Sequence, residues 1–328
     1  MPLTRDEIRL GYLYAFGREP ESEDVYKRYA NLEDVIALRR LLFESEEGQQ
    51  KIRQFHKKKG GHLIQTFERP AFCFIHMEKT GGTTFHYAIK DYFSPDYVSA
   101  PHIFELGLLP LQELASYDLV SGHFDYFTSL FIPRRLVLRA SIFRDPVERL
   151  LSLYRFLRSH PAYMRPGHPF MDLAGRLGPE DFFRHSQVLA SRRFNNAYYR
   201  TFGTTLFGPV DEAEDRRDLR VNLEVAIKRI RGLVGIGLTH RMKESIDSIL
   251  RQFALPPLRA FESRHQTDEF AKSVKGFAVV PPVEMTPELT GALAPLVAFD
   301  AELYRIASEE FEKRLNNPRI GVERRTGA

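Results

Sequence analysis

Four short apolar runs, three of them followed by a helical pattern, constrain the fold of this chain more than any other feature. The runs cover residues 71–76, 118–121, 136–143 and 233–238, and the helical pattern after the last one covers 242–250. Repetition of strand, turn and helix is typical of βαβ units. The sequence therefore predicts an α/β fold, in which helices cover both faces of a parallel sheet.

The N-terminal residues have a different sequence pattern. Residues 1 to about 55 carry helical patterns and no strand run, and the charged, glycine-bearing stretch 57–61 reads as a linker. We therefore expect two domains. The first, residues 1–62, is a small all-helical module with a basic linker, and the second, residues 63–328, holds the α/β fold.

Composition excludes several classes of protein. The chain has 328 residues, 43% of them hydrophobic and 27% charged, a balance that is typical of a globular protein. Its single cysteine, Cys73, rules out an intrachain disulfide and a cysteine-rich zinc site. A net charge of +4 favours anionic ligands but is too small to predict nucleic-acid binding.

The sequence also bears on location. No apolar stretch approaches the roughly 20 residues that a transmembrane helix needs. The charged N-terminal residues do not resemble a secretory signal. We expect a cytoplasmic protein without a transmembrane segment.

The segment 76–84 is the most informative motif. It reads His-Met-Glu-Lys-Thr-Gly-Gly-Thr-Thr and lies between the first expected strand and a helix start. Glycines allow a tight turn, and the free amides of a helix start favour an anion. Lys79 adds a positive charge and the threonines add hydroxyl donors, so the natural ligand is a phosphate or sulfate group.

Two familiar phosphate-binding patterns do not fit. In a Walker A loop the lysine follows the glycines, whereas Lys79 precedes Gly81 and Gly82. The dinucleotide-binding pattern fails because His240 stands where a third glycine belongs after Gly235 and Gly237. An ordinary strand-to-helix turn with two glycines remains the plain alternative.

A second candidate anion site follows the third expected strand. Asp145 is a good helix N-cap and Pro146 fits the first helical position, so Arg144 stands at the carboxyl end of the strand. Open α/β sheets bind ligands at this edge. Arg144 can bind a phosphate in a forked manner, and Ser152, two helical turns later, can add one donor. The alternative is that Arg144 pairs with Asp145 and that Ser152 has no role.

Together the two segments resemble the sulfotransferases that use 3′-phosphoadenosine 5′-phosphosulfate (PAPS). Their lysine-threonine-glycine loop binds the 5′-phosphosulfate, and their later R-D-P-x-x-R-x-x-S segment binds the 3′-phosphate. The resemblance implies a P-loop-like parallel sheet flanked by helices, with PAPS as co-substrate and PAP, the desulfated nucleotide, as product. The nucleotide-binding residues that it implies are Lys79, Thr80, Gly81, Gly82, Thr83, Thr84, Arg144 and Ser152.

The resemblance is closest to the carbohydrate 2-O-sulfotransferase branch and covers roughly residues 71–250. The segments 234–239 and 196–200 resemble two further motifs of these enzymes. Two positions depart from the pattern, because Glu78 replaces the usual proline and His240 replaces a common glutamate.

An acceptor hydroxyl needs a general base, and histidine suits neutral pH. His123 follows the second expected strand, in a Ser-Gly-His-Phe segment similar to the one that carries a catalytic histidine in the 2-O-sulfotransferase type. His76, Glu78 and His86 remain alternatives. Lys79 is expected to stabilise charge on the transferred group, and no metal is expected.

The resemblance implies a glycan or glycolipid-like acceptor. Because the chain is poor in cysteine and has no expected transmembrane segment, we expect an enzyme of bacterial type. Five arginines are candidates to bind an anionic acceptor, although solvated surface is the plainer interpretation: Arg155, Arg158, Arg165, Arg192 and Arg193. The N-terminal part weakly resembles a DUF4214-type helical module, through residues 12–20 and 42–45, and offers a surface for protein contacts.

Two other functions stay open. One is a nucleotide kinase or NTPase with an atypical phosphate loop, against which the missing glycine-lysine order counts. The other is a non-catalytic nucleotide-binding scaffold, in which the helical module binds partners.

Overall fold

A computed structural model describes residues 3–16, 18–32, 35–51, 70–100, 103, 106, 109, 111–134, 136–204, 221–258 and 271–316. The chain divides into two compact units. The first unit comprises Met1–Ile75, Lys90–Arg139 and Thr204–Pro209, and the second comprises His76–Ile89, Ala140–Gly203 and Val210–Ala328.

The described residues form a four-stranded, all-parallel sheet in the order β2-β1-β3-β4. The strands are β1 (Ala71–Ile75), β2 (Leu119–Gly122), β3 (Val137–Phe143) and β4 (Gly235–Leu238). Nearly all of their residues are buried, as expected for a parallel sheet with both faces covered. Each strand falls on one of the four apolar runs, so the predicted α/β class and parallel sheet are confirmed.

Register places the carboxyl ends of paired strands level with one another. Ile75 of β1 pairs with Gly122 of β2, and Phe143 of β3 pairs with Leu238 of β4. The segments that follow these strands therefore begin at the same edge of the sheet, where parallel α/β folds bind their ligands.

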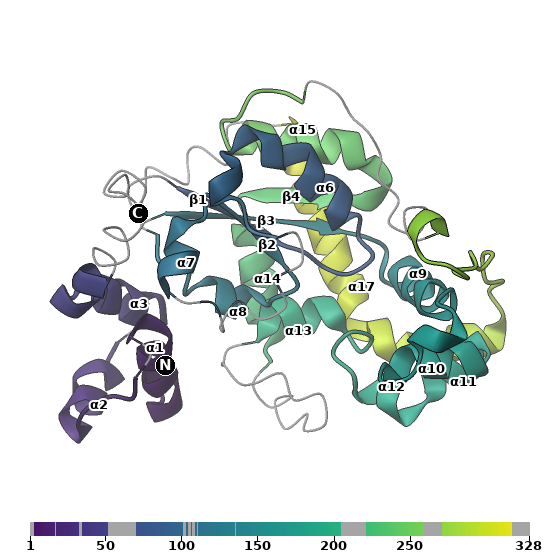
Figure 1. The fold of residues 1–328 in the computed structure, drawn as a ribbon, viewed down its shortest axis with the longest axis horizontal. Helices are drawn as coiled ribbons and strands as arrows, with labels where there is room; N and C mark the ends of the chain where they lie inside the picture. Colours follow the sequence, from purple (N-terminus) through teal and green to yellow (C-terminus); the bar gives the residue numbers. More distant parts are fainter. Residues whose placement is uncertain are drawn as a thin grey trace. The chain divides into compact units, whose positions relative to one another are not determined.

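Helices of the second unit flank the sheet. In Figure 1, α6 (Gly82–Ile89) and α15 (Met242–Gln252) lie on one side of it, and α13 (Ala197–Gly203) and α14 (Leu223–Gly232) lie on the other. The long helix α17 (Pro287–Asn316) contacts β4 and helices of both groups, α14 and α15. The sequence from Pro287 to about Leu315 also reads as helical, and α17 covers this range. Among the described residues, no helix has both the length and the apolar character that crossing a membrane requires.

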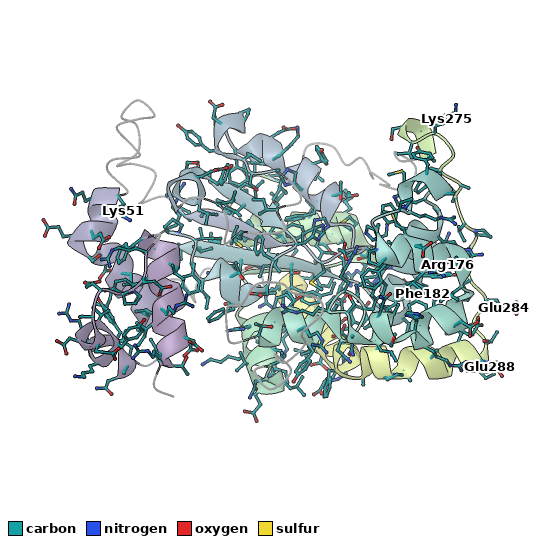
Figure 2. All side chains as sticks on the ribbon, turned by 60° about the horizontal axis from the view of Figure 1, so that its bottom comes forward. Lys51, Arg176, Phe182, Lys275, Glu284 and Glu288 are labelled. Atoms are coloured by element: carbon teal, nitrogen blue, oxygen red, sulfur yellow. The ribbon has the colours of Figure 1, made fainter. Side chains whose placement is uncertain are left out.

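Four further helices of the second unit form a hydrophobic core with the first half of α17. They are α9 (Pro146–Arg158), α10 (Pro169–Arg176), α11 (Pro179–Arg184) and α12 (Ser186–Ala190). Phe182 of α11 and Leu289 of α17 are both fully buried in this cluster. Phe182 is labelled in Figure 2, together with Glu288 in the first turn of α17.

The first unit holds the N-terminal helices α1 (Arg5–Phe16), α2 (Glu23–Ala30) and α3 (Val35–Glu44), with α7 (Leu111–Ser116) and α8 (Tyr126–Ser129). The buried side chains of α1 to α3 share one hydrophobic cluster with Phe127, Leu130 and Phe131. The expected linker 57–61 and the boundary at residue 62 lie outside the described residues. A separate helical domain therefore stays a prediction.

Candidate anion-binding site

The loop 76–81 joins β1 to α6, and its own side chains help to shape it. The Thr80 hydroxyl donates to the Met77 carbonyl at 2.8 Å. The Phe85 amide donates to the Gly81 carbonyl at 3.2 Å, which is the first hydrogen bond of α6. The first amides of a helix have no partner within it and lie at the positive end of its dipole. The loop therefore ends at the N-terminus of α6, where the free amides and the helix dipole favour an anion.

Two loop residues adopt left-handed backbone conformations. Gly81 has φ of 84°, which glycine adopts without strain. Lys79 has φ of 65°, which disfavours any residue with a side chain by about 1–2 kcal/mol. Sequence reasoning missed the second case, because lysine carries no signal for this conformation. The surrounding contacts must hold Lys79 in it.

Gly82 is required for a different reason. A Cβ atom at residue 82 would lie 2.0 Å from Cδ2 of the His76 ring, so no other residue fits without movement of that ring. His76 is itself buried and lies against the first residue of α6. The two glycines expected for the turn thus have separate physical roles, one conformational and one steric.

The Lys79 side chain lies over an aromatic ring of α9. Its Nζ atom is 4.2 Å from the centre of the Phe156 ring, which is within cation–π distance. Burial lowers the pKa of Lys79 to about 8, and the nearby cations Arg144 and Arg155 add to the effect while Glu78 opposes it. Lys79 is therefore an ammonium group in a partly desolvated, positively charged environment.

Arg144 reaches the same loop from the end of β3. Its Nη1 atom donates to the Lys79 carbonyl at 3.3 Å, across 65 residues of sequence. The Tyr198 hydroxyl holds the Arg144 backbone, accepting from its amide at 3.0 Å and donating to its carbonyl at 2.7 Å. The structure thus brings together the leading residues of the two predicted anion motifs.

The start of α9 follows the predicted pattern. The Asp145 carboxylate accepts from the Glu148 amide at 3.0 Å, and Pro146 occupies the first helical position. Arg144 contacts Glu148, with Nε 3.3 Å from the carboxylate, rather than pairing with Asp145 as the plain alternative expected. Ser152 lies two turns into α9 and is half-buried.

A forked ion pair ties the loop to the segment before α13. Arg193 donates from Nε and Nη2 to the two oxygens of Glu78, at 2.9 and 2.8 Å. Arg193 was expected either to bind the acceptor or to be solvated. Neither interpretation foresaw this partner, 115 positions away in the sequence.

The other candidate arginines on or near α9 contact main-chain carbonyls. Arg155 donates twice to the Val280 carbonyl, at 3.0 and 2.8 Å. Arg158 donates to the carbonyls of Ala174 and Leu177, both at 2.8 Å. These side chains are half-buried, so the expectation of solvated surface is wrong for them.

His123 belongs to the first unit, whereas Lys79 and Arg144 belong to the second. It directly follows β2 and is half-buried, and its amide donates to the Ile103 carbonyl at 2.7 Å. His86 is buried within α6. The choice of His123 as base over His76, Glu78 and His86 stays a prediction.

Two residues near the loop were missed as parts of the site. The Thr239 hydroxyl donates to the Thr80 carbonyl at 2.7 Å and lies 3.2 Å from the Phe143 carbonyl, which connects the loop to the ends of β3 and β4. His160 is buried, with Nδ1 2.8 Å from the Phe156 carbonyl, and burial lowers its pKa, with Lys79 adding to the effect. Only Thr239 had a sequence signal, through the resemblance of segment 234–239 to a family motif, and His160 had none.

Comparison with known proteins adds no assignment. No protein-family model matches the chain, and no curated protein matches it.

Proposed function

We propose that this chain is a sulfotransferase that moves the sulfuryl group of PAPS to a hydroxyl of a carbohydrate-type acceptor. The main support for the proposal is the contact of Arg144 with the Lys79 carbonyl, because it joins the two predicted anion-binding motifs at one edge of the sheet. PAPS has anionic groups at its 5′ and 3′ positions, so it needs two such motifs within reach of one nucleotide.

The charge balance supports a ligand with several negative charges. Lys79, Arg144 and Arg155 are close enough to one another that the two arginines lower the pKa of Lys79. Two carboxylates lie close to these cations: that of Glu78 is paired with Arg193, and that of the more exposed Glu148 lies 3.3 Å from Nε of Arg144. Bringing a phosphosulfate to such a site relieves the repulsion among its cations.

In the proposed reaction, the acceptor oxygen attacks sulfur in line with the bridging oxygen of PAPS. The new oxygen–sulfur bond forms as the bond from sulfur to the bridging oxygen breaks, and the electron pair stays on the 5′-phosphate of the departing PAP. Lys79 and the amides at the start of α6 stabilise the negative charge on the sulfuryl and phosphate oxygens. His123 takes the proton of the acceptor hydroxyl.

The first experiment measures PAP binding by calorimetry. Wild-type protein is expected to bind PAP without Mg²⁺. Lys79→Ala and Arg144→Ala are expected to weaken binding at least tenfold, since each removes a cation from the site. Lys243→Ala, which removes an exposed lysine on α15, is the matched control and is expected to bind normally. Absence of PAP binding by the wild type would overturn the proposal.

A second experiment separates transfer from binding. Wild-type protein with [³⁵S]PAPS is expected to label members of an oligosaccharide panel, and mass spectrometry locates the modified hydroxyl. His123→Ala is expected to keep PAP affinity and lose transfer, whereas unchanged transfer would reject His123 as the base. Mg²⁺-dependent ATP hydrolysis would favour the kinase alternative, and PAP binding without transfer to any acceptor would favour the scaffold.

A further inference from the structure

The Glu78–Arg193 ion pair has the geometry of a strong contact. Both donors of the guanidinium fork meet both carboxylate oxygens, at 2.8 and 2.9 Å. The two side chains are 21% and 28% exposed, whereas those of the surface pair Arg176–Asp172 are 62% and 46% exposed. Partial burial weakens solvent screening, so the forked pair constrains its two segments more than an exposed pair does.

The Arg193 end of the pair is anchored to a buried helix face. Arg149 of α9 is 1% exposed, and its Nη1 and Nη2 atoms both donate to the Arg193 carbonyl at 3.1 Å. The Arg193 guanidinium also lies 5.8 Å from the centre of the Phe170 ring, which is buried in the core of α9 to α12. The arginine is therefore a fixed point rather than a mobile surface side chain.

The Glu78 end acts on the residue next to it. Lys79 has the unfavourable left-handed backbone and is held on its other side by the Arg144 contact to its carbonyl. The Thr239 hydroxyl holds the following residue, Thr80. Residues 78, 79 and 80 are thus each tied to a different segment of the chain, and a strained conformation persists only where its surroundings determine it in this way.

We propose that Arg193 is a positioning residue, which through its ion pair with Glu78 holds Lys79 in the left-handed conformation that presents the loop to an anionic ligand. Identification of that ligand as a PAPS-type nucleotide rests on the proposed function. The positioning itself does not, because it concerns the order of the loop in the free protein.

The test compares Arg193→Gln with Arg176→Gln, which breaks an exposed arginine–carboxylate pair within α10. Arg193→Gln is expected to speed amide hydrogen exchange of residues 78–81 at least tenfold in the free protein, with exchange in the strands unchanged. Arg176→Gln is expected to leave loop exchange as it is. PAP affinity is expected to fall about tenfold in Arg193→Gln only.

Two further variants keep the inference falsifiable. Glu78→Gln breaks the same pair from the other end, is expected to speed loop exchange equally, and replaces Arg193→Gln if that variant does not fold. The charge-swapped variant Glu78→Arg/Arg193→Glu is expected to restore slow loop exchange, because the pair reforms. A contact that supported only general stability would instead speed exchange throughout the second unit.

The outcomes for the two proposals differ. Unchanged loop exchange in Arg193→Gln and Glu78→Gln would overturn the positioning role, whatever the wild type binds. Faster loop exchange in a protein that does not bind PAP would leave the positioning role standing and overturn the proposed function.

Discussion

At the scale of single residues, Lys79 shows how an environment sets the chemistry of a side chain. Burial and two neighbouring arginines bring its pKa down to about 8. The ammonium form predominates below that pH and is held 4.2 Å above the Phe156 ring. An anionic ligand favours the charged form, so ligand affinity and the ionisation of Lys79 are linked.

Affinity for PAP is therefore expected to fall as pH rises through about 8. Below that pH Lys79 is charged before the ligand binds. Above it Lys79 must take up one proton on binding, so each further pH unit lowers the affinity by up to tenfold. Calorimetric titrations between about pH 6.5 and 9.5 measure the slope. The arginine of Lys79→Arg stays charged over the whole range, so the PAP affinity of this variant should not change with pH. If the variant showed the same slope as the wild type, another group would be responsible for the titration.

Substitution of Gly82 tests whether the close approach of the His76 ring requires glycine at this position. Gly82→Ala is expected to lower the free energy of unfolding by about 1–3 kcal/mol, since its Cβ would overlap the His76 ring. Gly291→Ala, at a position in α17 with no neighbouring atom within 4 Å, is expected to raise it by about 0.5–1 kcal/mol. Urea denaturation monitored by circular dichroism compares both, and equal effects would contradict the steric explanation.

At the scale of elements, the side chain of Asn196, directly before α13, completes the main-chain hydrogen bonding of α17. The proline at position 295 lies inside α17. Nearby, Asn196 Oδ1 accepts from the Phe299 amide at 2.8 Å and its Nδ2 donates to the Pro295 carbonyl at 2.9 Å. In return, the Asp300 carboxylate accepts from the amide of Tyr198 in the first turn of α13. The two helices are thus joined by reciprocal hydrogen bonds, Asn196 to the main chain inside α17 and Asp300 to the main chain at the start of α13.

Asn196→Ala is expected to destabilise the protein by about 2–4 kcal/mol, because the Phe299 amide and the Pro295 carbonyl each lose a partner beside the buried Asn196. Asn196→Gly should lose nearly as much, even though glycine suits the φ of 48° at this position. Asn195→Ala removes two side-chain hydrogen bonds, the exposed one to the Leu189 carbonyl and the one that Asn195 Oδ1 accepts from Asn196 Nδ2. It leaves both contacts of Asn196 with α17 in place, so it serves as the control, with a smaller effect of about 1 kcal/mol. Chemical denaturation ranks the three variants.

At the scale of the whole molecule, the N-terminal helices do not form a hydrophobic core from their own residues alone. Leu38 of α3 is fully buried in the cluster that also contains Phe127, Leu130 and Phe131. Burial of these aromatic and aliphatic side chains links the stability of the helices to that of residues near α8.

Leu38→Ala is therefore expected to destabilise both parts of this cluster by about 2–5 kcal/mol. Amide hydrogen exchange should accelerate in α1 to α3 and equally at Leu130 and Phe131, whose amides donate within the turn after α8. Exchange that accelerates in the N-terminal helices alone would instead support an independent helical domain ending near residue 62.

The sequence by itself determined the class of fold and the positions of the strands. Apolar runs bounded by glycine, proline and capping residues are local signals, and they located β1 to β4, the start of α9 and the extent of α17. The same local chemistry singled out the Lys79 loop and Arg144 as candidate anion-binding segments.

Only the tertiary structure decided which of these segments meet. The strand order is one such decision. The contact of Arg144 with the Lys79 carbonyl and the forked pair of Glu78 with Arg193 are two more, and they join residues 65 and 115 positions apart. Long side chains on separate elements carry no local signal of their partners, since their pairing depends on how the sheet and its helices pack. The left-handed conformation of Lys79 is also set by tertiary contacts, because the backbone preference of lysine alone opposes it.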